Sequence, residues 1–417
     1  MKVAVIGTGI SGLATAFHLQ EQGHEVVVYE ARGRPGGNIF TEEVEGCRVE
    51  WATNGFLDNE PATLDLVRAL GIEDRLVRAN TDAAVRLIWR SGKLRRLPTK
   101  PPQFLTSDVL PQRGKLRALR EPFIPPRVGD RDESIWQFAA RRLGKQAADV
   151  LVDAFVTGVW AGDPKRLSLQ STFPKLLELE TEHGSLIKGM KATKRDAAPR
   201  GVLTSFDHGM QVLIDALASR LDLRLATPLT TLPSGYDHFV LTLPAPKAAE
   251  LVEEPLAGAL RRVPTAPVAV VALSLHASAL DGVLPAFGFL VPRGQKLRML
   301  GTLYSSHIFP NRAPEGYYLF RVLIGGRRDP DAVMLDDDAL LSIAVSELEK
   351  VWKRKLTPRT THVMRHTLGI AQYEIGHAAL LDTIAKSKPP ELHLLGTSYR
   401  GVSLNAAIAE AAALRID

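Results

Sequence analysis

The chain has 417 residues, a formal net charge of +6 and a hydrophobic content of 45%, enough for two or more domains with a sizeable core. Its single cysteine, Cys47, excludes an internal disulfide and a cysteine-based metal site. No apolar run reaches the roughly 18–20 residues that a spanning helix requires. We expect no targeting segment and no nucleic-acid partner, because no helix-turn-helix, zinc or RNA-binding signature occurs.

The N-terminus predicts a strand, a glycine turn, a helix and a second strand in immediate succession. Residues 3–6 are apolar, GTGISG follows at 7–12, and residues 13–22 are rich in alanine and helical in pattern. A second strand over 25–29 then ends at Glu30. This order of elements is typical of a dinucleotide-binding unit.

Each conserved position of that unit has a physical role. Gly7 allows the tight turn, Gly9 lets the backbone approach a pyrophosphate, and Gly12 lets the helix pack close to the sheet. The pyrophosphate would sit on the free N–H groups of the helix N-terminus, and Glu30 would accept hydrogen bonds from a ribose hydroxyl. The turn adds two further candidate cofactor-binding residues, Ile10 and Ser11.

The residues after Glu30 indicate which dinucleotide binds. EARGRPGG places Arg34 four residues after the acid, with Gly36 and Gly37 beyond it. A second glycine turn beside an arginine gives another anion-facing backbone concavity. This arrangement resembles the FAD-containing amine-oxidase superfamily rather than NAD dehydrogenases, and it adds Ala31, Arg34, Gly36 and Gly37 to the candidate cofactor site.

A basic block lies between residues 86 and 127, with eleven lysines and arginines against only Asp108 and Glu121. Such a block suits an anionic membrane surface or an anionic substrate, and a solvated protein face is the plain alternative. Two apolar pairs lie between the charges, Phe104-Leu105 and Val109-Leu110. We expect this segment to bind anionic bilayers without spanning them.

Periodicity and turn residues predict the remaining elements in chain order. They are a helix over 61–70, a hairpin over 84–97, helices over 133–143, 147–155 and 207–221, strands over 268–275, 288–291, 299–304 and 317–325, a helix over 336–353, a strand over 393–396 and a helix over 404–414.

The fold class is therefore α/β with α+β elements, and we expect a Rossmann-like FAD-binding domain built from discontinuous segments. The other two expected parts of the chain are a mostly antiparallel substrate domain and a helical membrane-binding insertion. The predicted boundaries are 1–80, 206–262 and 361–417 for the FAD-binding domain, 81–98 and 263–360 for the substrate domain, and 99–205 for the insertion.

The C-terminal strand–glycine–helix unit, LLGTSYRGVSLNAAIAEA, resembles the closing unit of flavoproteins. In that unit a helix N-terminus points at the flavin pyrimidine and stabilises charge on the reduced ring. The residues concerned are Gly396, Val402, Ser403 and Leu404.

A collinear set of motifs covers nearly the whole chain and resembles the protoporphyrinogen oxidase family. It includes GTGISGLATAFHL, TNGFLDNEPAT, TGVWAGDP, SFDHGMQVLIDAL, GTLYSSHIFPNRAPEG and IAQYEIGH. The resemblance implies oxidation of protoporphyrinogen IX to protoporphyrin IX by non-covalent FAD and molecular oxygen, with hydrogen peroxide as product. It also implies a monomer or homodimer, peripheral on the cytoplasmic membrane, that hands its product to the next haem-pathway enzyme, ferrochelatase.

The resemblance also implies roles for single residues. Arg86 pairs with a substrate propionate, Asn54 faces the flavin and the pocket, and the backbone of Gly158 approaches a pyrrole. Three apolar side chains sandwich the macrocycle: Leu290, Leu303 and Leu323. The family positions at the flavin further include Gly55, Phe56 and Leu229.

Several positions depart from the family pattern. Ala52-Thr53 stands where relatives have Gly-Pro, His366 stands where they have tryptophan, and Ser403 stands where they have glycine. Serine is also a favoured helix N-cap. The strands expected between residues 228 and 238 are nearly absent. His362 and His366 lack the intervening glutamate of a zinc motif, so we expect no metal.

Three alternatives therefore stay open. The same fold oxidises coproporphyrinogen III in some relatives, and another FAD amine or polyene oxidase is a second reading. A catalytically weak flavin- or tetrapyrrole-binding protein of the haem pathway is the third, because the departures affect positions at the flavin.

Overall fold

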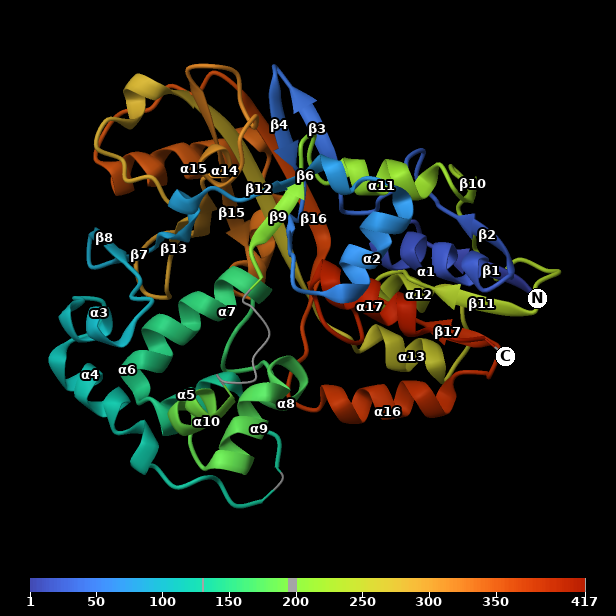
Figure 1. The fold of residues 1–417 in the computed structure, drawn as a ribbon, viewed down its shortest axis with the longest axis horizontal. Coiled ribbons are helices and arrows are strands. Elements are labelled where there is room, and N and C mark those ends of the chain that lie inside the picture. The colour runs from blue at the N-terminus through green and yellow to red at the C-terminus, as the bar shows by residue number, and fades with distance from the viewer. Residues whose placement is uncertain (130, 194–200, 417) are drawn as a thin grey trace.

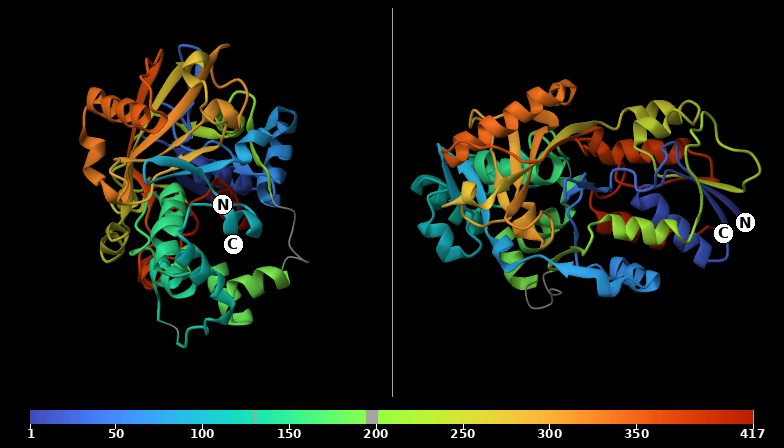
Figure 2. Two further views of the ribbon diagram at one scale, coloured as in Figure 1. Left: turned by 90° about the vertical axis from the view of Figure 1, so that its left-hand side faces the viewer. Right: turned by 90° about the horizontal axis from the view of Figure 1, so that it is seen from above.

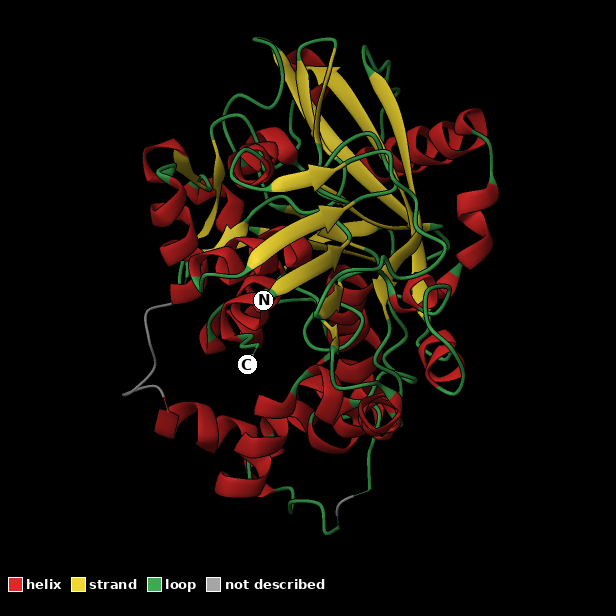
Figure 3. Cartoon of the chain, turned by 90° about the vertical axis from the view of Figure 1, so that its right-hand side faces the viewer, coloured by secondary structure: helices red, strands yellow, loops and turns green. Residues whose placement is uncertain are grey.

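The structure is a computed structural model that describes residues 1–129, 131–193 and 201–416. Figure 1 shows three parts: a parallel sheet between helices, a larger mostly antiparallel sheet, and a group of helices below the larger sheet. Figure 3 shows the strands of the two large sheets in yellow, with helices around them. The α/β fold with a discontinuous Rossmann-like domain is confirmed.

The parallel sheet has the strand order β10-β2-β1-β11-β17 and unites segments from both ends of the chain. Its strands read as nearly continuous apolar runs because helices cover both faces. The strands are β1 (Lys2–Ile6), β2 (Glu25–Tyr29), β10 (Asp222–Arg224), β11 (His238–Leu241) and β17 (Leu392–Leu394). No strand forms between β10 and β11, as the shortened sequence there predicts.

Helices pack on both faces of this sheet (Figure 1). On one face, α1 and α17 pack directly against each other. The helices of that face are α1 (Ile10–Glu21), α2 (Pro61–Leu70), α11 (Gln211–Ala218) and α17 (Leu404–Ala413). Those of the other are α12 (Ala245–Ala248), α13 (Leu256–Arg261) and α16 (His377–Ser387).

The second sheet has the order β16-β12-β15-β14-β13-β7-β8, and all its pairs are antiparallel except β13 with β7. Helix α15 (Asp337–Trp352) packs against one face. The strands are β7 (Arg86–Arg90), β8 (Lys93–Arg96), β12 (Thr265–His276), β13 (Gly288–Leu290), β14 (Met299–Leu303), β15 (Tyr317–Gly325) and β16 (Thr361–Ala371).

One predicted boundary is wrong, because β16 pairs with β12. Residues 361–371 therefore belong to the antiparallel sheet rather than to the FAD-binding domain. Several short elements lie outside the two large sheets, and sequence periodicity did not reveal them. They are the hairpin β3 (Thr41–Val44) and β4 (Cys47–Glu50), the small sheet of β5 (Phe56–Leu57), β6 (Leu76–Arg78) and β9 (Leu203–Phe206), and the helix α14 (Ser305–Ile308).

The helical part begins with α3 (Pro101–Thr106) and α4 (Gln112–Leu119) and continues through α5 (Ile135–Arg142). Ser134 and Gln137 form a capping box that starts α5. A π-helical turn, Ala148–Val152, joins α6 (Lys145–Ala147) to α7 (Asp153–Trp160). The other helices are α8 (Leu169–Thr172), α9 (Pro174–His183) and α10 (Leu186–Ala192). Among the described residues, no helix is long and apolar enough to cross a membrane.

The basic block is less uniform than its sequence indicates. The prediction that Val109 and Leu110 contact a bilayer is wrong, because both side chains are buried. Lys115 is also buried and donates to the carbonyl oxygen of Leu105 at 2.7 Å, while Arg95 pairs with Asp108 at 2.8 Å. Part of the positive charge therefore holds the helical part together.

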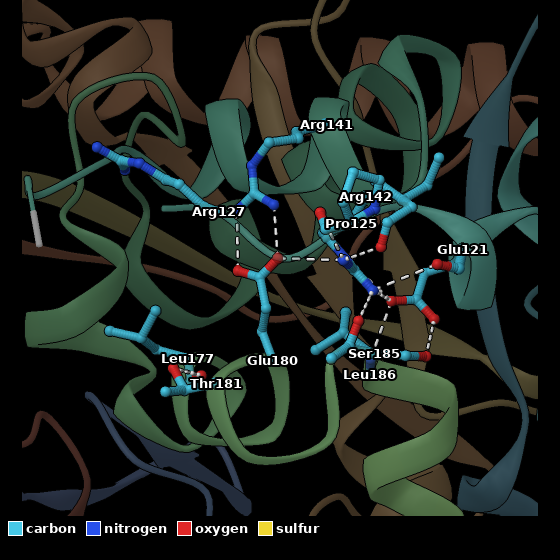
Figure 4. Close-up of polar contacts among 12 residues, drawn as sticks. Glu121, Pro125, Arg127, Arg141, Arg142, Leu177, Glu180, Thr181, Ser185 and Leu186 are labelled. Atoms are coloured by element: carbon cyan, nitrogen blue, oxygen red, sulfur yellow. Dashed lines mark hydrogen bonds and ion pairs between the residues drawn. The ribbon is translucent and has the colours of Figure 1, made fainter. Parts of the chain in front are cut away.

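A buried ion network ties the helices of this part (Figure 4). Arg142 is fully buried, donates from Nε to Glu121 at 2.8 Å, and lies 3.1 Å from Glu180. Arg141 donates to the same Glu180 at 2.5 Å, and Ser185 donates to Glu121 at 2.6 Å. Burial alone would raise the carboxyl pKa values of both glutamates, but these hydrogen bonds outweigh it and lower them.

Candidate functional site

The glycine turn after β1 has the geometry that dinucleotide binding requires. Gly7 lies at φ +107°, and a Cβ at Gly12 would overlap the carbonyl oxygen of Gly7. Around Gly9, by contrast, no heavy atom lies within 4 Å of the place a Cβ would take. Gly7 and Gly12 are therefore required by the fold, whereas Gly9 leaves room for a ligand at the N-terminus of α1.

The second glycine turn lies against the first. The N–H of Gly36 donates to the carbonyl oxygen of Thr8 at 2.9 Å, and a Cβ at Gly37 would lie 3.1 Å from the Cα of Gly9. Arg34 donates to the carbonyl oxygen of Gly37 at 3.2 Å, and its guanidinium lies over the Phe40 and Trp51 rings. Burial, together with the neighbouring Arg32, lowers the pKa of Arg34.

Glu30 stands at the end of β2, beside the first turn. Its carboxylate accepts hydrogen bonds from the backbone N–H of Thr8 at 3.0 Å and from the Thr8 hydroxyl at 2.5 Å. The adjacent Ala31 is exposed, and the backbone of Thr227 donates to the Glu30 carbonyl at 2.8 Å. Leu229 follows in the same segment and packs among the residues near Tyr29. Glu30, the predicted ribose-binding acid, therefore lies beside the two glycine turns, which together form the dinucleotide cradle.

The C-terminal unit meets the same region. A Cβ at Gly396 would lie 3.2 Å from the Ser11 hydroxyl, which places the turn after β17 beside the start of α1. Ser403 caps α17 by accepting from the Ala406 N–H at 3.1 Å, and Val402 before it is half-buried. The serine is thus accommodated as an N-cap.

Some candidate cofactor residues contribute packing rather than exposed side chains. Ile10, Phe56 and Leu404 are buried in one apolar cluster. A Cβ at Gly55 would overlap the carbonyl oxygen of Thr204. Only the backbone of these four positions is left to reach a cofactor.

Asn54 lies on a loop that polar side chains hold from two sides. Arg321 donates to Asn54 Oδ1 at 2.7 Å and to the carbonyl oxygens of Glu50 and Ala52 at 2.5 and 3.0 Å. His366 contacts the carbonyl oxygen of Trp51 at 2.8 Å through Nε2, and burial lowers its pKa. Successive carbonyls of this loop are therefore fixed by Arg321 and His366 from the antiparallel sheet.

The antiparallel sheet gathers the predicted substrate residues on one face. Its register pairs Arg86 with Gly288, Gly288 with Leu303, and Leu303 with Arg321. The neighbouring row pairs Leu290 with Gly301 and Gly301 with Leu323. Because paired residues share a face, Arg86, Leu290, Leu303 and Leu323 all lie on the side opposite α15.

Helix α7 adds the remaining predicted residue. A Cβ at Gly158 would lie 2.9 Å from Leu290, so the absence of a side chain allows the helix to approach the sheet. Arg86 is exposed, with its guanidinium carbon 5.1 Å from the centre of the Phe287 ring. The face thus combines half-buried leucines with a cation at one edge.

Sequence reasoning missed Arg321, which is buried yet contacts Asn54. The available signal was a lone arginine inside the apolar run LFRVLI. A buried charge of this kind needs hydrogen-bond partners, so it indicates a specific polar contact. Burial lowers the pKa of Arg321 to about 10, which leaves it charged at neutral pH. The described residues contain no cluster of three or more metal-ligating side chains.

The fold and the paired glycine turns define a dinucleotide-binding protein with a second, apolar sheet face beside the dinucleotide cradle. The open space at Gly9 fits a pyrophosphate. Asn54 Nδ2, a buried donor without a hydrogen-bond partner among the described residues, fits an acceptor on a bound group.

Comparisons with known proteins agree with this class. The model of the flavin containing amine oxidoreductase family matches residues 10–413. The chain is 33% identical to the chloroplastic protoporphyrinogen oxidase of Oryza sativa subsp. japonica, over 96% of this chain and 84% of that protein. It is 28% identical to coproporphyrinogen III oxidase of Bacillus subtilis, over 96% and 94%. The crystal structure of a candidate protoporphyrinogen oxidase from Exiguobacterium sp. 255-15 superposes with a TM-score of 0.86 at 24% identity, over 99% of this chain and 97% of that one.

The chain therefore belongs to the flavin containing amine oxidoreductases and, within them, to the protoporphyrinogen oxidase family. It is an oxidoreductase, and its cofactor is FAD.

Proposed function

We propose that this protein oxidises protoporphyrinogen IX to protoporphyrin IX, with FAD as cofactor and molecular oxygen as acceptor. The observation that carries the proposal is the sheet face that unites Arg86, Leu290, Leu303 and Leu323 beside Gly158. A large apolar ring with carboxylate arms matches that combination of leucines and one cation. The substrate loses six hydrogens in three two-electron cycles, and each cycle reduces one O2 to H2O2.

The residues of the chain chiefly orient the substrate. The three leucines offer an apolar platform, and Arg86 offers a planar guanidinium that suits a propionate. Gly158 lets α7 lie close against Leu290, so the backbone of the helix borders the leucine face. FAD supplies the hydride acceptor and passes the electrons to oxygen. Positioning of the ring against the cofactor supplies most of the catalysis.

We further propose that FAD is bound without a covalent bond. The chain's single cysteine, Cys47, is buried on β4 among apolar residues, and burial raises the pKa of its thiol. Heat denaturation should therefore release all flavin into the supernatant as free FAD. Flavin retained on the precipitated chain would contradict non-covalent binding.

Coproporphyrinogen III is a second candidate substrate. Relatives named coproporphyrinogen III oxidase in Bacillus subtilis and Staphylococcus aureus match over 94% and 95% of their own length. The two porphyrinogens share the ring and differ in the number of propionates. Competition between them under air, followed by the fluorescence of the two products, ranks them by kcat/KM.

We also propose that the protein lies peripherally on the cytoplasmic membrane, as a monomer or homodimer, and passes its product to ferrochelatase. In support of the membrane location, the helical part exposes apolar side chains beside basic residues. They are Leu105, Leu116, Leu119, Phe123 and Val128, with Lys100, Arg113 and Arg120 nearby in the chain.

The decisive experiment follows porphyrin fluorescence and peroxide after protoporphyrinogen is added to purified protein under air. We expect a flavin absorbance spectrum, growing porphyrin emission, and three peroxides for each porphyrin formed. Flavin without porphyrin formation above the spontaneous rate would identify a binding protein. Oxidation of an amine or polyene instead would identify another branch of the family.

A further inference from the structure

We propose that Arg321 is a positioning residue that turns the Asn54 amide so that its Nδ2 donates a hydrogen bond to the flavin. The inference rests on FAD as the cofactor and on Asn54 facing it, and it does not depend on which porphyrinogen is oxidised.

The contact of Arg321 decides the orientation of the amide. A guanidinium has donors only, so the atom of Asn54 that it contacts at 2.7 Å must be the oxygen. Nδ2 then lies on the other arm of the planar amide, directed away from Arg321. Asn54 is 9% exposed, and Nδ2 has no hydrogen-bond partner within the part of the chain that the structure describes. Such a buried donor is expected to meet an acceptor.

The surroundings of Asn54 connect it to the cofactor cradle. Trp51, three residues earlier, lies against Arg34, which in turn holds Gly37 beside Gly9. Three residues later, the carbonyl oxygen of Leu57 accepts from Asn405 in the first turn of α17 at 2.9 Å. The loop that carries Asn54 therefore runs between the pyrophosphate turns and the helix terminus of the closing unit. An oxidised isoalloxazine bound beside this loop would supply acceptors, since its N5 and carbonyl oxygens accept hydrogen bonds.

Arg321 is well suited to hold this orientation. It is buried, and the carbonyls of Glu50 and Ala52 hold its other terminal nitrogen, so the guanidinium cannot swing away from Asn54. A lysine at this position would keep the charge and lose the planar fork. The amide would then be free to rotate and present its oxygen to the flavin.

A double-mutant cycle tests the inference. Arg321→Lys and Asn54→Ala should each shift the visible absorption band of bound flavin and weaken FAD binding by about two- to tenfold. The double variant should match Asn54→Ala alone, because both changes remove the same hydrogen bond. Unchanged flavin absorbance and FAD affinity in Arg321→Lys, or fully additive effects, would overturn the proposal.

Two further variants separate orientation from folding. Arg312→Lys changes another buried arginine, which contacts Ser205 at 3.0 Å and Glu50 at 3.8 Å. It should lower Tm and leave the flavin spectrum as in the parent. Asn54→Asp keeps an acceptor toward Arg321 but removes the donor, so it should fold and still lose FAD affinity. An Asn54→Asp variant that binds FAD as tightly as the parent would also overturn the proposal, whatever Arg321→Lys does.

Discussion

At the scale of single residues, the departures from the family pattern form one arrangement. Ala52-Thr53 replaces a rigid Gly-Pro pair, and His366 replaces a tryptophan. In the structure the Ala52 carbonyl is held by Arg321 and the Trp51 carbonyl by His366, while the Thr53 hydroxyl donates to the Gly55 carbonyl at 2.9 Å. Hydrogen bonds from side chains thus hold the backbone of this loop in place.

Gly9 offers a clean test of the cofactor cradle. Its backbone lies at φ −62° and ψ 170°, which alanine adopts without strain, and no heavy atom lies within 4 Å of the added Cβ. Gly9→Ala should leave the stability of the FAD-free protein unchanged or raise it by up to about 1 kcal/mol. The methyl group should nevertheless fill the space meant for pyrophosphate and weaken FAD binding at least about tenfold.

The measurements are Tm of the FAD-free protein and FAD titration by fluorescence quenching. Gly23→Ala is the control for FAD affinity, since that exposed glycine follows α1 at the end far from the turn; because its φ is +89°, alanine there should lower Tm and leave FAD affinity unchanged. FAD binding at parental affinity in Gly9→Ala would refute the assigned cradle.

Arg86 tests the substrate side of the site. A charge-assisted pair with a carboxylate is worth roughly 1.5–3 kcal/mol, so Arg86→Ala should raise KM about ten- to a hundredfold with normal flavin content. The propionate lies away from the carbon that loses hydride, so kcat should change less. Arg86→Lys should recover part of the loss. Steady-state fluorescence assays decide, and an alanine variant with parental KM would remove Arg86 from the substrate site.

At the scale of elements, the helical part depends on buried charges more than on a large apolar core. Glu121, Arg142 and Glu180 join the segment after α4 to α5 and α9 (Figure 4). Periodicity predicts α5 and part of the α6–α7 helix but misses α9 and α10. These two helices pack against each other, but their buried polar contacts, Glu180 with Arg142 and Ser185 with Glu121, join residues distant in sequence and leave no local pattern.

Removal of Arg142 should destabilise this part selectively. Arg142→Met leaves the buried carboxylate of Glu121 without a cationic partner, whereas Glu180 keeps Arg141, and it should cost about 3–5 kcal/mol. Limited proteolysis should then cut between residues 99 and 193 while FAD remains bound. Arg68→Met is the control, because the exposed Arg68–Asp65 pair is worth only about 0–1 kcal/mol. Equal protease resistance of the two variants would contradict a stabilising role for the network.

The exposed apolar side chains make membrane binding testable at the same scale. Phe123 is 85% exposed beside Arg120. Phe123→Ser should weaken binding to anionic vesicles about ten- to a hundredfold in co-sedimentation, because about 1.5–3 kcal/mol of apolar burial is lost. High salt should weaken binding of the parent, since each basic residue near the surface contributes about 1 kcal/mol. Val109→Ala, at a buried position, is the control. It should change folding stability and leave vesicle binding and its dependence on salt as in the parent. If high salt left vesicle binding of the parent protein unchanged, the proposed electrostatic contribution to membrane binding would be wrong.

At the scale of the whole molecule, the cofactor domain and the substrate sheet are both discontinuous and meet along the loop of Asn54. Figure 2 shows from two further sides how the N-terminal (blue) and C-terminal (red) segments intertwine in one domain. The half-buried Ile370 of β16 packs against apolar clusters of both sheets. Folding of the cofactor domain therefore requires both chain ends.

Stability should depend on pH through buried histidines. Burial lowers the pKa of His366 and His377, and it lowers that of His393 to about 4, with Lys388 and His238 adding to the effect. The folded state binds fewer protons than the unfolded one, whose histidines titrate near about 6.5. The histidine contribution to the free energy of unfolding is therefore fully present above about pH 6.5, and it is lost as the pH drops from there toward about 4.

We expect Tm to fall by several degrees between pH 7.5 and 5.5, measured by scanning calorimetry. Buried Glu50 and Glu410 act in the opposite direction, because burial raises their carboxyl pKa values. The variant His393→Asn isolates the histidine contribution and should show a smaller fall. An identical pH profile in that variant would contradict the role of His393.

The sequence by itself determined the local elements whose signals are short-range. Gly7, Gly12 and Glu30 specify the first turn, and Gly71 ends α2 with the predicted left-handed cap. Alternation and β-branched runs located β12 and β15 but not β16, and a family resemblance proposed the site residues. Only the tertiary structure decided the rest. It paired β13 with β7 so that Arg86 and Leu290 share a face, placed β16 in the antiparallel sheet, buried Val109 and Leu110, and brought Arg321 to Asn54 across 267 residues. Register and buried polar contacts join residues distant in the chain, so no local pattern encodes them.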